Sequence, residues 1–408
     1  MGRSRECELL IVGRPADGLR RNDRSTSASL PPAADRLAEW KLSPAQTVAA
    51  GQALRYLEAV AEPHAIARAR VPRREFLLWA VTGAGKTEMI FPLIESVLLR
   101  GGTALVATPR TDVVRELDPR IRRAFPGRTI ATLYGGSEQR WERAEITLAT
   151  THQLLRFAEA FDLVVIDELD AFPFHGSPML HHAADRAGTP SGTRVLLSAT
   201  PPRTLKLRAE RGRLAHARIP VRYHRKPLPV PMLLAVSAVR EMLNKKRIPA
   251  KLQAAIQASV ARGAQLFIFV QQIAHAEGMA ALVATVCPPH ARVGYTSSKD
   301  ADRAEQVRRF RESELRVLVT TTILERGVTI PRSDVIVLDA DGRLFDEASL
   351  VQMAGRAGRS ADDPYGKVVF CAPTRSRSQL AAVRHIRQMN RIAERQGYLL
   401  HGERGSRA

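Results

Sequence analysis

The sequence predicts an α/β protein with two tandem, doubly wound parallel sheets, and three observations lead to this prediction. The chain has 408 residues, which is more than one ordinary domain contains. Short runs rich in Val, Ile and Leu alternate with longer helical patterns, as βαβ units require. This alternation stops in a basic stretch with several prolines and then begins again, so two sheets are expected instead of one.

The predicted strands are continuous apolar runs, which parallel strands covered on both faces need. The first set comprises residues 76–81, 103–108, 130–134, 146–150, 163–167 and 194–198. The second set comprises residues 265–270, 292–295, 316–322, 335–339 and 367–371. The first domain is therefore expected at residues 41–203 and the second at residues 235–374.

Three segments lie outside these two domains. Residues 1–40 are expected to form a flexible lead-in, because Ser, Arg, Pro and Asp cluster there. Residues 204–234 are basic and contain several prolines, which is typical of an interdomain linker. Residues 375–408 are expected to form a basic C-terminal helix that packs on the second domain, followed by a tail.

Composition limits the partner and the metal chemistry. There are 62 Lys and Arg residues against 41 Asp and Glu residues, and the formal charge of +21 favours a polyanionic partner. A GC-rich genome would produce the same excess of Arg without such a partner. The cysteines, Cys7, Cys287 and Cys371, are too far apart to form a disulfide framework or a four-cysteine zinc site, so no zinc is expected.

The sequence also predicts a cytoplasmic protein. The N-terminus is rich in Arg but lacks the uninterrupted apolar core of a signal peptide. The most apolar later stretch, residues 266–287, is interrupted by Gln271, Gln272, His275 and Glu277, so it is not expected to span a membrane. A peripheral association with a membrane is the most that these features allow.

A phosphate-binding loop is predicted directly after the first strand. The loop precedes a helical pattern and consists of Thr82, Gly83, Ala84, Gly85, Lys86 and Thr87. Glycines let backbone N–H groups surround phosphate oxygens, and the helix N-terminus adds partial positive charge. Lys86 is expected to contact the β- and γ-phosphates of ATP, and Thr87 to bind Mg²⁺. Ala80 stands where the usual pattern has its first glycine, and a chance glycine-rich turn is the alternative.

Carboxylates at the end of strand 163–167 are predicted to face this loop. Asp167 is expected to hold Mg²⁺ through water, and Glu168 to orient and deprotonate the attacking water. Asp170 is expected to accept hydrogen bonds from Ser198 and Thr200, which would link the nucleotide state to the gap between the domains. An exposed acidic turn is the alternative, but the phosphate-binding loop at this separation argues against it.

Two interpretations of Gln46 remain open. The side-chain amide can donate to and accept from the adenine base of ATP. It can also form a capping box with Ser43, with Pro44 at the first helical position. The two roles are compatible.

The second domain is predicted to supply the other half of the ATP site. Residues 352–359 place two guanidiniums three positions apart on one helix face, beside Gln352. A planar, permanently charged group suits the charge that spreads over the γ-phosphate oxygens during phosphoryl transfer. Arg359 is the first choice for this arginine finger, with Arg356 beside it, and a solvated basic helix is the alternative. Because the finger comes from the other domain, hydrolysis would require a closed cleft.

Small, hydroxyl-bearing and basic residues at the predicted strand ends are suited to nucleic-acid phosphates, which position a strand without reading its sequence. The candidates are Thr108, Arg110, Gly136, Thr150, Thr151, His152, Thr320 and Thr321. Each alone is little different from an ordinary loop residue. Gly327 is expected near ATP, and Arg326 in the coupling of the ATP site to this track.

Two aromatic residues, Phe172 and Phe174, follow the acidic turn. They can stack on nucleic-acid bases and report the presence of a strand to the ATP site. They can equally well pack in the hydrophobic core, and the sequence favours neither role.

Five segments together resemble helicase superfamily 2 and, more narrowly, the ComFA family of late-competence ATPases, which is related to the helicase PriA. The segments are ATPRTDVV (107–114), TTHQLLRF (150–157), DELDAFPF (167–174), TTILERGVT (321–329) and LVQMAGRAGRS (350–360). The resemblance covers about residues 40–371, and TTHQLLRF and DAFPF are its most specific parts. It implies two RecA-like P-loop NTPase domains that use ATP with Mg²⁺.

The resemblance further implies ATP-driven movement of single-stranded DNA into the cytoplasm during natural transformation. The implied partners are a membrane channel protein, a phosphoribosyltransferase-like competence protein and a protein that loads onto single strands. ComFA proteins usually carry a four-cysteine zinc module before the first motor domain, and only Cys7 lies in that region here. Functions that depend on zinc are therefore not expected.

Three other functions are considered. A PriA-like replication-restart or repair helicase would carry cysteine clusters between the motor motifs and an added DNA-binding domain, and neither is visible. An RNA helicase is the second, because phosphate contacts do not distinguish DNA from RNA. The third is a basic DNA-binding scaffold with an inactive ATPase, against which Lys86, Glu168 and Arg359 argue.

Overall fold

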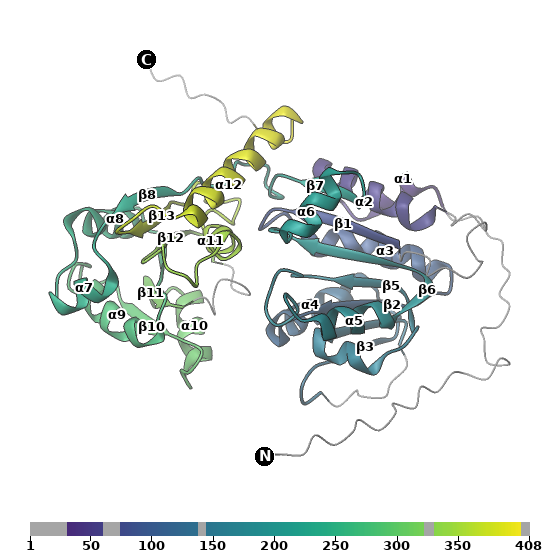
Figure 1. Ribbon diagram of the computed structural model, residues 1–408, viewed down its shortest axis with the longest axis horizontal. Helices are drawn as coiled ribbons and strands as arrows, with labels where there is room; N and C mark the ends of the chain where they lie inside the picture. The colour runs from purple at the N-terminus through teal and green to yellow at the C-terminus, as the bar shows by residue number, and fades with distance from the viewer. Residues whose placement is uncertain (1–30, 60–73, 138–143, 322–329, 401–408) are drawn as a thin grey trace.

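The computed structural model describes residues 31–59, 74–137, 144–321 and 330–400, and it shows two α/β domains side by side (Figure 1). Each domain contains one sheet, and every strand pair in the described part is parallel. The predicted fold class is therefore confirmed. Parallel strands must be covered on both faces, which explains their nearly continuous burial.

The first sheet has the strand order β3-β4-β2-β5-β6-β1-β7. Its strands are β1 (Arg74–Ala80), β2 (Ala104–Thr108), β3 (Ile130–Leu133), β4 (Ile146–Thr150), β5 (Phe161–Ile166), β6 (Gly188–Ser198) and β7 (Ala215–Ile219). The helices of this half are α1 (Ala33–Glu39), α2 (Pro44–Glu58), α3 (Lys86–Leu99), α4 (Thr111–Ala124), α5 (Pro178–Ala187) and α6 (Arg203–Glu210), and a 3₁₀ turn, η3, spans Thr151–Arg156.

The second sheet has the strand order β10-β11-β9-β12-β13-β8. Its strands are β8 (Met232–Ala235), β9 (Gln265–Phe269), β10 (Val293–Thr296), β11 (Val317–Thr320), β12 (Ser333–Val337) and β13 (Val368–Ala372). The helices are α7 (Val239–Asn244), α8 (Ala250–Ala261), α9 (Ala276–Ala284), α10 (Arg303–Arg311), α11 (Glu347–Ala354) and α12 (Arg377–Arg395), with a 3₁₀ turn, η4, at Ile273–His275.

The hydrophobic core crosses the boundary between the domains. Along β9, Phe267 and Phe269 belong to a cluster of buried side chains that continues into the first domain. Leu266 and Ile268, which point to the other face of the sheet, belong to a second cluster confined to the second domain. The face of the second sheet that carries the first cluster therefore contributes to holding the two domains together.

Two of the expected segment boundaries are wrong. Residues 33–39 of the expected lead-in form α1, which packs on α2 through Leu37 and through an ion pair of 2.7 Å between Arg36 and Glu58. The expected linker, residues 204–234, contains α6 and two edge strands, since β7 pairs with β1 and β8 begins beside β13. His216 and Arg218 interrupt the apolar pattern of β7, and both side chains are only partly buried, as is common in an edge strand.

The predicted C-terminal helix is present as α12. A capping box formed by Ser376 and Gln379 begins it. The helix packs on α11 of the second domain, as expected, and it also reaches the first domain (Figure 1). The ring centre of His385 lies 6.1 Å from that of Trp79 in β1 of the first domain. This helix therefore bridges the two domains.

The strand order of the first sheet determines which candidate residues lie near one another. The carboxyl ends of all its strands meet at one edge, because the strands are parallel. The loops after β5, β6, β1 and β7 lie on one half of this edge, and the loops after β3, β4 and β2 lie on the other. We call these the nucleotide half and the outer half of the edge.

Candidate ATP site and nucleic-acid interface

The predicted phosphate-binding loop joins β1 to α3. Gly83 and Gly85 have φ angles of +78° and +71°, a left-handed conformation that favours glycine. Lys86 and Thr87 begin α3, so the free backbone N–H groups of its first turn face the loop. The Nζ atom of Lys86 lies 3.8 Å from Oδ1 of Asp167, which directly follows β5.

The acidic residues after β5 are arranged around this loop. The backbone N–H of Glu168 donates to Oδ1 of Asp167 at 2.8 Å, and Glu168 itself has a φ of +53°. Asp170 accepts hydrogen bonds from the hydroxyls of Ser198 and Thr200, both at 2.7 Å. These two bonds are the ones that the sequence predicted. They tie the acidic turn to the end of β6.

Gln46 supports the loop from the side of α2. Its Oε1 accepts from the backbone N–H of Ser43, so the predicted capping box is confirmed. Its Nε2 donates to the carbonyl oxygens of Ala84 and Gly85 at 2.8 and 3.2 Å. The amide thus holds the backbone of the phosphate-binding loop, and Gln46 also lines the cleft in which an adenine contact is expected.

The second domain completes this cleft, as predicted. A cavity of 610 Å³ is lined on one side by the phosphate-binding loop, Asp167 and Glu168, and on the other by Gln352, Arg356 and Arg359. Burial lowers the pKa of the Arg359 guanidinium, while the carboxylates of Glu116 and Glu168 act in the opposite direction. Arg359, which is partly exposed, therefore lines the cavity opposite Glu116 and Glu168 of the first domain.

The residues present fit a nucleoside triphosphate with a divalent cation. The cavity contains the ammonium of Lys86, the guanidiniums of Arg356 and Arg359 and a helix N-terminus for phosphate, together with Thr87 and Asp167 as hard oxygen donors for Mg²⁺. The buried Nε2 of Gln352 has no hydrogen-bond partner among the residues that the structure describes. A buried donor without a partner is costly, and a phosphate oxygen would satisfy it.

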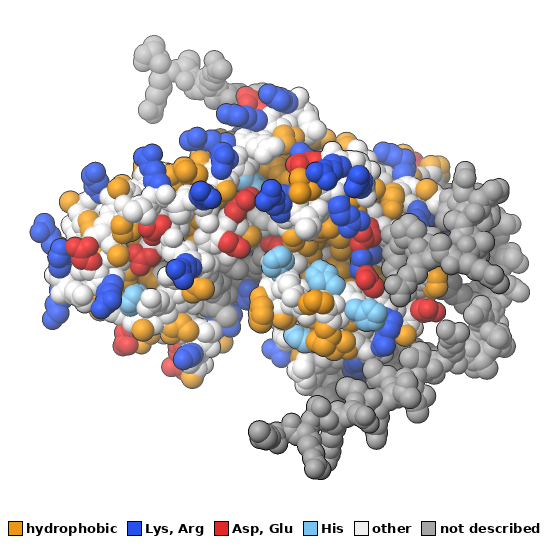
Figure 2. Space-filling view, in the orientation of Figure 1, with side chains coloured by type: hydrophobic (Ala, Val, Ile, Leu, Met, Phe, Trp, Pro, Cys, Tyr) orange, Lys and Arg blue, Asp and Glu red, His pale blue; other side chains and the backbone are white. Residues whose placement is uncertain are grey.

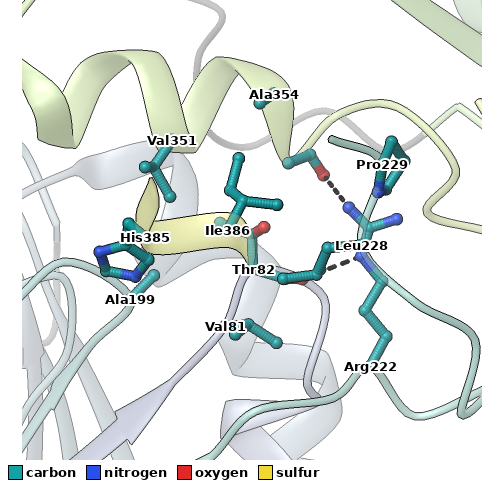
Figure 3. Close-up of a pocket in the computed structure, with 11 residues that line it drawn as sticks. Val81, Thr82, Ala199, Arg222, Leu228, Pro229, Val351, Ala354, His385 and Ile386 are labelled. Atoms are coloured by element: carbon teal, nitrogen blue, oxygen red, sulfur yellow. Dashed lines mark hydrogen bonds between the residues drawn. The ribbon is translucent and has the colours of Figure 1, made fainter. Parts of the chain in front are cut away.

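Sequence reasoning missed Arg222, which lies beside this cleft. Its guanidinium is buried between the phosphate-binding loop and the turn that carries Arg356 and Arg359 (Figure 3). A strand signal for β7 would have placed residues 220–223 next to the loop, because β7 pairs with β1. Tyr223, half exposed at the rim of the cavity, was missed for the same reason.

The predicted phosphate-contacting residues divide by exposure. Thr108, Thr150, Thr151, Thr320 and Thr321 are buried, so in this arrangement their side chains offer no surface to a strand. This corrects the expectation for these five hydroxyls as direct contacts, because the strand ends that carry them, and the residues directly after two of these ends, are covered. The remaining candidates are at least partly exposed, namely Gly136, His152 and Arg110, whose guanidinium pairs with Asp112 at 3.0 Å.

The two aromatic residues after the acidic turn are also in different environments. Phe172 is 87% exposed, whereas Phe174 is 2% exposed and packs on His181 with the ring centres 4.4 Å apart. The stacking role predicted for Phe174 is therefore wrong, because its ring is part of the core. Phe172 is free to stack on a base. Arg326 and Gly327 lie outside the described residues.

Comparisons with known proteins agree with this arrangement. Residues 63–207 match the family model described as DEAD/DEAH box helicase, and residues 248–361 match the helicase conserved C-terminal domain. The competence protein ComFA of Bacillus subtilis is 44% identical over 79% of this chain and 69% of its own length. The chain belongs to the ComFA family.

A second ComFA protein, from Streptococcus pneumoniae, is 40% identical over 84% of this chain and 78% of its own length. The replication restart protein PriA of B. subtilis is 27% identical over 48% of this chain and 26% of its own length. Family membership and the two helicase models make this ComFA protein a helicase-type ATPase of superfamily 2 that uses ATP with a divalent metal.

Solved structures show the same fold in distant helicases. S. cerevisiae Dbp5 bound to RNA and ADP BeF3 has a TM-score of 0.60 at 16% identity, covering 88% of this chain and 92% of that one. RecG bound to a three-way DNA junction has a TM-score of 0.58 at 18% identity, covering 89% and 48%. The ComFA chain thus shares its two-domain architecture with proteins of several substrates, and this likeness establishes the fold alone.

Three further properties of this ComFA protein concern its contacts with nucleic acid, membranes and metal ions. Figure 2 shows Lys and Arg side chains spread over both domains on the face that it presents, and not gathered in one patch. In the ranges that the structure describes, no helix is both long and apolar enough to cross a bilayer. Within the same ranges, no three His, Cys, Asp or Glu side chains are grouped so that they could hold a metal ion.

Proposed function

We propose that this protein is an ATP-driven motor that moves single-stranded DNA during DNA uptake in natural competence. The observation that carries the proposal is the position of Arg359, which comes from the second domain and lines the same cavity as Asp167 and Glu168 of the first. A site divided in this way makes hydrolysis depend on the relative position of the domains, which a motor requires. The names of its relatives support the competence role.

In the proposed mechanism the first domain grips ATP and activates water. The loop N–H groups and Lys86 bind the β- and γ-phosphates, and Glu168 orients the attacking water and takes its proton. Mg²⁺, held by Thr87 and Asp167, would offset phosphate charge. From the second domain, Arg359 and Arg356 stabilise the charge that develops on the γ-phosphate, and Gln352 donates to a phosphate oxygen.

The proposed route from hydrolysis to movement passes through the acidic turn. Asp170 is bonded to Ser198 and Thr200, and Phe172 projects from the same turn into solvent. A base stacked on Phe172 would therefore change the position of the acidic turn, which carries Asp170 two residues away and Glu168 four residues away. In this proposal Arg110, Gly136 and His152 hold the phosphates of the strand, and Arg326 and Gly327 couple the second domain to ATP.

The location and partners belong to the same proposal. We place the protein in the cytoplasm at the inner face of the membrane, next to a DNA channel and a phosphoribosyltransferase-like competence protein. The domain boundaries proposed are residues 33–219 for the first motor domain and residues 232–374 for the second. The names of the ComFA relatives support the competence setting, and the edge strands β7 and β8 support the boundaries.

The test is the rate of ATP hydrolysis with and without single-stranded DNA, for the wild type, Lys86→Ala and Glu168→Gln. The wild type should be stimulated by DNA, and each substitution should lower turnover by about a hundredfold or more. Matched RNA strands form the second arm. Equal stimulation by RNA would contradict the choice of DNA, and full turnover in either variant would contradict the assigned roles.

A further inference from the structure

Arg222 lies at the junction of the two domains because β7 runs beside β1. The backbone N–H of Val81 donates to the carbonyl of Ile219, and that of Tyr223 donates to the carbonyl of Gly83. Residues 219–223 therefore extend alongside the phosphate-binding loop. The Arg222 side chain leaves this segment toward the second domain, as Figure 3 shows, and it has 1% exposure.

The guanidinium of Arg222 donates to both halves of the ATP site. Its Nε donates to the carbonyl of Thr82 in the phosphate-binding loop at 3.2 Å. Its Nη1 donates to the carbonyls of Ala357, at 2.7 Å, and Gly358, and its Nη2 donates to the carbonyl of Gly355 at 3.3 Å. These three acceptors of the second domain lie on both sides of Arg356 in the sequence, and the last of them directly precedes Arg359.

The backbones approach closely at this point. A Cβ atom on Gly355 would collide with the side chain of Thr82, so only glycine fits there. A Cβ atom on Gly83 would lie 3.5 Å from both Arg222 and Arg359, so the two arginine side chains cross the loop next to each other. Arg222 and Arg359 therefore pack next to each other over the loop, so that the position of one side chain limits the position of the other.

The surroundings of Arg222 are unusual for a buried charge. Among the described residues it forms no ion pair, and its partners are four backbone carbonyls. Burial and the positive charge of Arg359 lower its pKa to about 9, so it still carries its charge at neutral pH. Carbonyl oxygens that lost these donors would be buried without partners, which is costly on both sides of the cleft.

We propose that Arg222 is a positioning residue for ATP hydrolysis, which fixes the backbone of residues 355–358 on the phosphate-binding loop so that Arg359 faces the γ-phosphate. This inference rests on the proposed function, because it assigns the finger role to Arg359. Arg222 itself does not reach the reacting atoms. It acts through the turn that it holds, and the planar fork of a guanidinium is needed to bridge four acceptors.

The first test compares Arg222→Lys with Arg225→Lys. Arg225 lies three residues away and also donates to backbone carbonyls, but those of Gly397 and Tyr398 beyond α12. Lysine keeps the charge and cannot bridge the two domains with a fixed fork. Arg222→Lys should lower kcat of basal ATP hydrolysis about tenfold to a hundredfold, with KM for ATP changed less than about threefold. Arg225→Lys should match the wild type.

A purely structural role is distinguished by two further measurements. Arg222→Lys should bind ADP as the wild type does, and should bind ADP with aluminium fluoride, a mimic of the transferring phosphoryl group, about tenfold more weakly. In a double-mutant cycle, Arg222→Lys should cost little in an Arg359→Ala background, because the residue acts through Arg359. The proposal would be overturned if Arg222→Lys lowered kcat equally in the wild-type and Arg359→Ala backgrounds. It would also be overturned if Arg222→Lys weakened the binding of ADP as much as that of ADP with aluminium fluoride.

Folding is checked by circular dichroism for each variant. If Arg222→Lys does not fold, Arg222→Gln, which keeps a neutral donor, takes its place in the same measurements. Failure of both to fold would overturn the positioning role in favour of a structural one. A wild type without DNA stimulation would contradict the proposed function alone, since this test uses the basal rate, and an unchanged kcat in Arg222→Lys would contradict this inference alone.

Discussion

The nucleotide half and the outer half of the first sheet's edge are built differently. In the nucleotide half, Asp170, Gln46 and Arg222 each bond to backbone or side-chain groups from distant segments. In the outer half, the buried hydroxyls of Thr108 and Thr151 have no hydrogen-bond partner within the described residues. The three residues named in the nucleotide half are held in place by distant segments, whereas these two hydroxyls of the outer half are unsatisfied.

This difference indicates which half changes when a ligand binds. A buried hydroxyl without a partner costs about 1–3 kcal/mol, so a rearrangement that lets Thr108 and Thr151 reach an acceptor would be favourable. Gly136, with a φ of +88°, lies in a loop of the same half. The nucleotide half already has both domains at the ATP site, whereas the outer half would need a local change in its loops.

The largest effect expected is the loss of Arg359. Arg359→Ala should lower kcat for ATP hydrolysis about a thousandfold, since an arginine finger stabilises the charge of the transferring phosphoryl group. Arg384→Ala, on the exposed face of α12, is the matched control and should leave kcat unchanged. The assay is steady-state ATP turnover at saturating ATP. A loss smaller than about tenfold would mean that the nucleotide half works without the second domain.

The next largest effect concerns the aromatic pair, which differs only in burial. Phe172→Ala should weaken single-stranded DNA binding roughly fivefold to a hundredfold, because one base stack contributes about 1–3 kcal/mol. Phe174→Ala should leave DNA affinity of the folded protein unchanged and lower the free energy of unfolding by about 3–5 kcal/mol. Fluorescence anisotropy and urea unfolding measure the two quantities. Equal effects on both would remove the distinction between the exposed and the buried ring.

The same pair shows what sequence can and cannot predict here. The strand runs, the phosphate-binding loop, the acidic turn and the arginine segment are contiguous patterns, so their positions followed from the sequence. Phe172 and Phe174 are two positions apart in one pattern, and only tertiary packing decides which ring is buried. The buried threonines were overestimated for the same reason, because a strand end at a sheet edge can be covered or open.

Arg222 and the edge strands mark a second limit. All four acceptors of Arg222 are backbone carbonyls, and those in the second domain lie up to 136 positions away. Every residue has such a carbonyl, so the sequence does not indicate the contact. Short edge strands such as β7 need only partial burial, and His216 and Arg218 conceal the apolar pattern. Both features arise from how segments pair in space.

A smaller effect is expected at the bond between the acidic turn and β6. Thr200→Val removes one of the two hydroxyls on Asp170 without changing side-chain volume much. DNA stimulation of the ATPase should fall about fivefold to tenfold, the usual size of coupling between two sites, while basal turnover stays near the wild-type value. Thr374→Val, which breaks a similar bond of 2.7 Å to Asp341, is the control. Parallel loss of basal turnover would show that the bond serves catalysis and not coupling.

The smallest effect concerns an ion-pair cluster that joins the domains behind the nucleotide half. Glu347 accepts from His385 at 3.0 Å and pairs with Lys206 of the first domain at 3.1 Å, and these contacts lower its pKa to about 2. A lowered carboxyl pKa stabilises the folded protein above the unfolded value of 4.5, and this contribution is lost as the pH falls from 4.5 toward 2. Glu347→Gln should therefore be less stable than the wild type at pH 6, with the gap narrowing on acidification. Solvent screening keeps the gap small, because the Glu347 side chain is 36% exposed.

Thermal unfolding between pH 6 and pH 3 measures this difference in stability, with Glu394→Gln as an exposed control on α12. A gap independent of pH would mean that Glu347 acts by packing, so that charge would not contribute to joining the second domain to the nucleotide half of the edge.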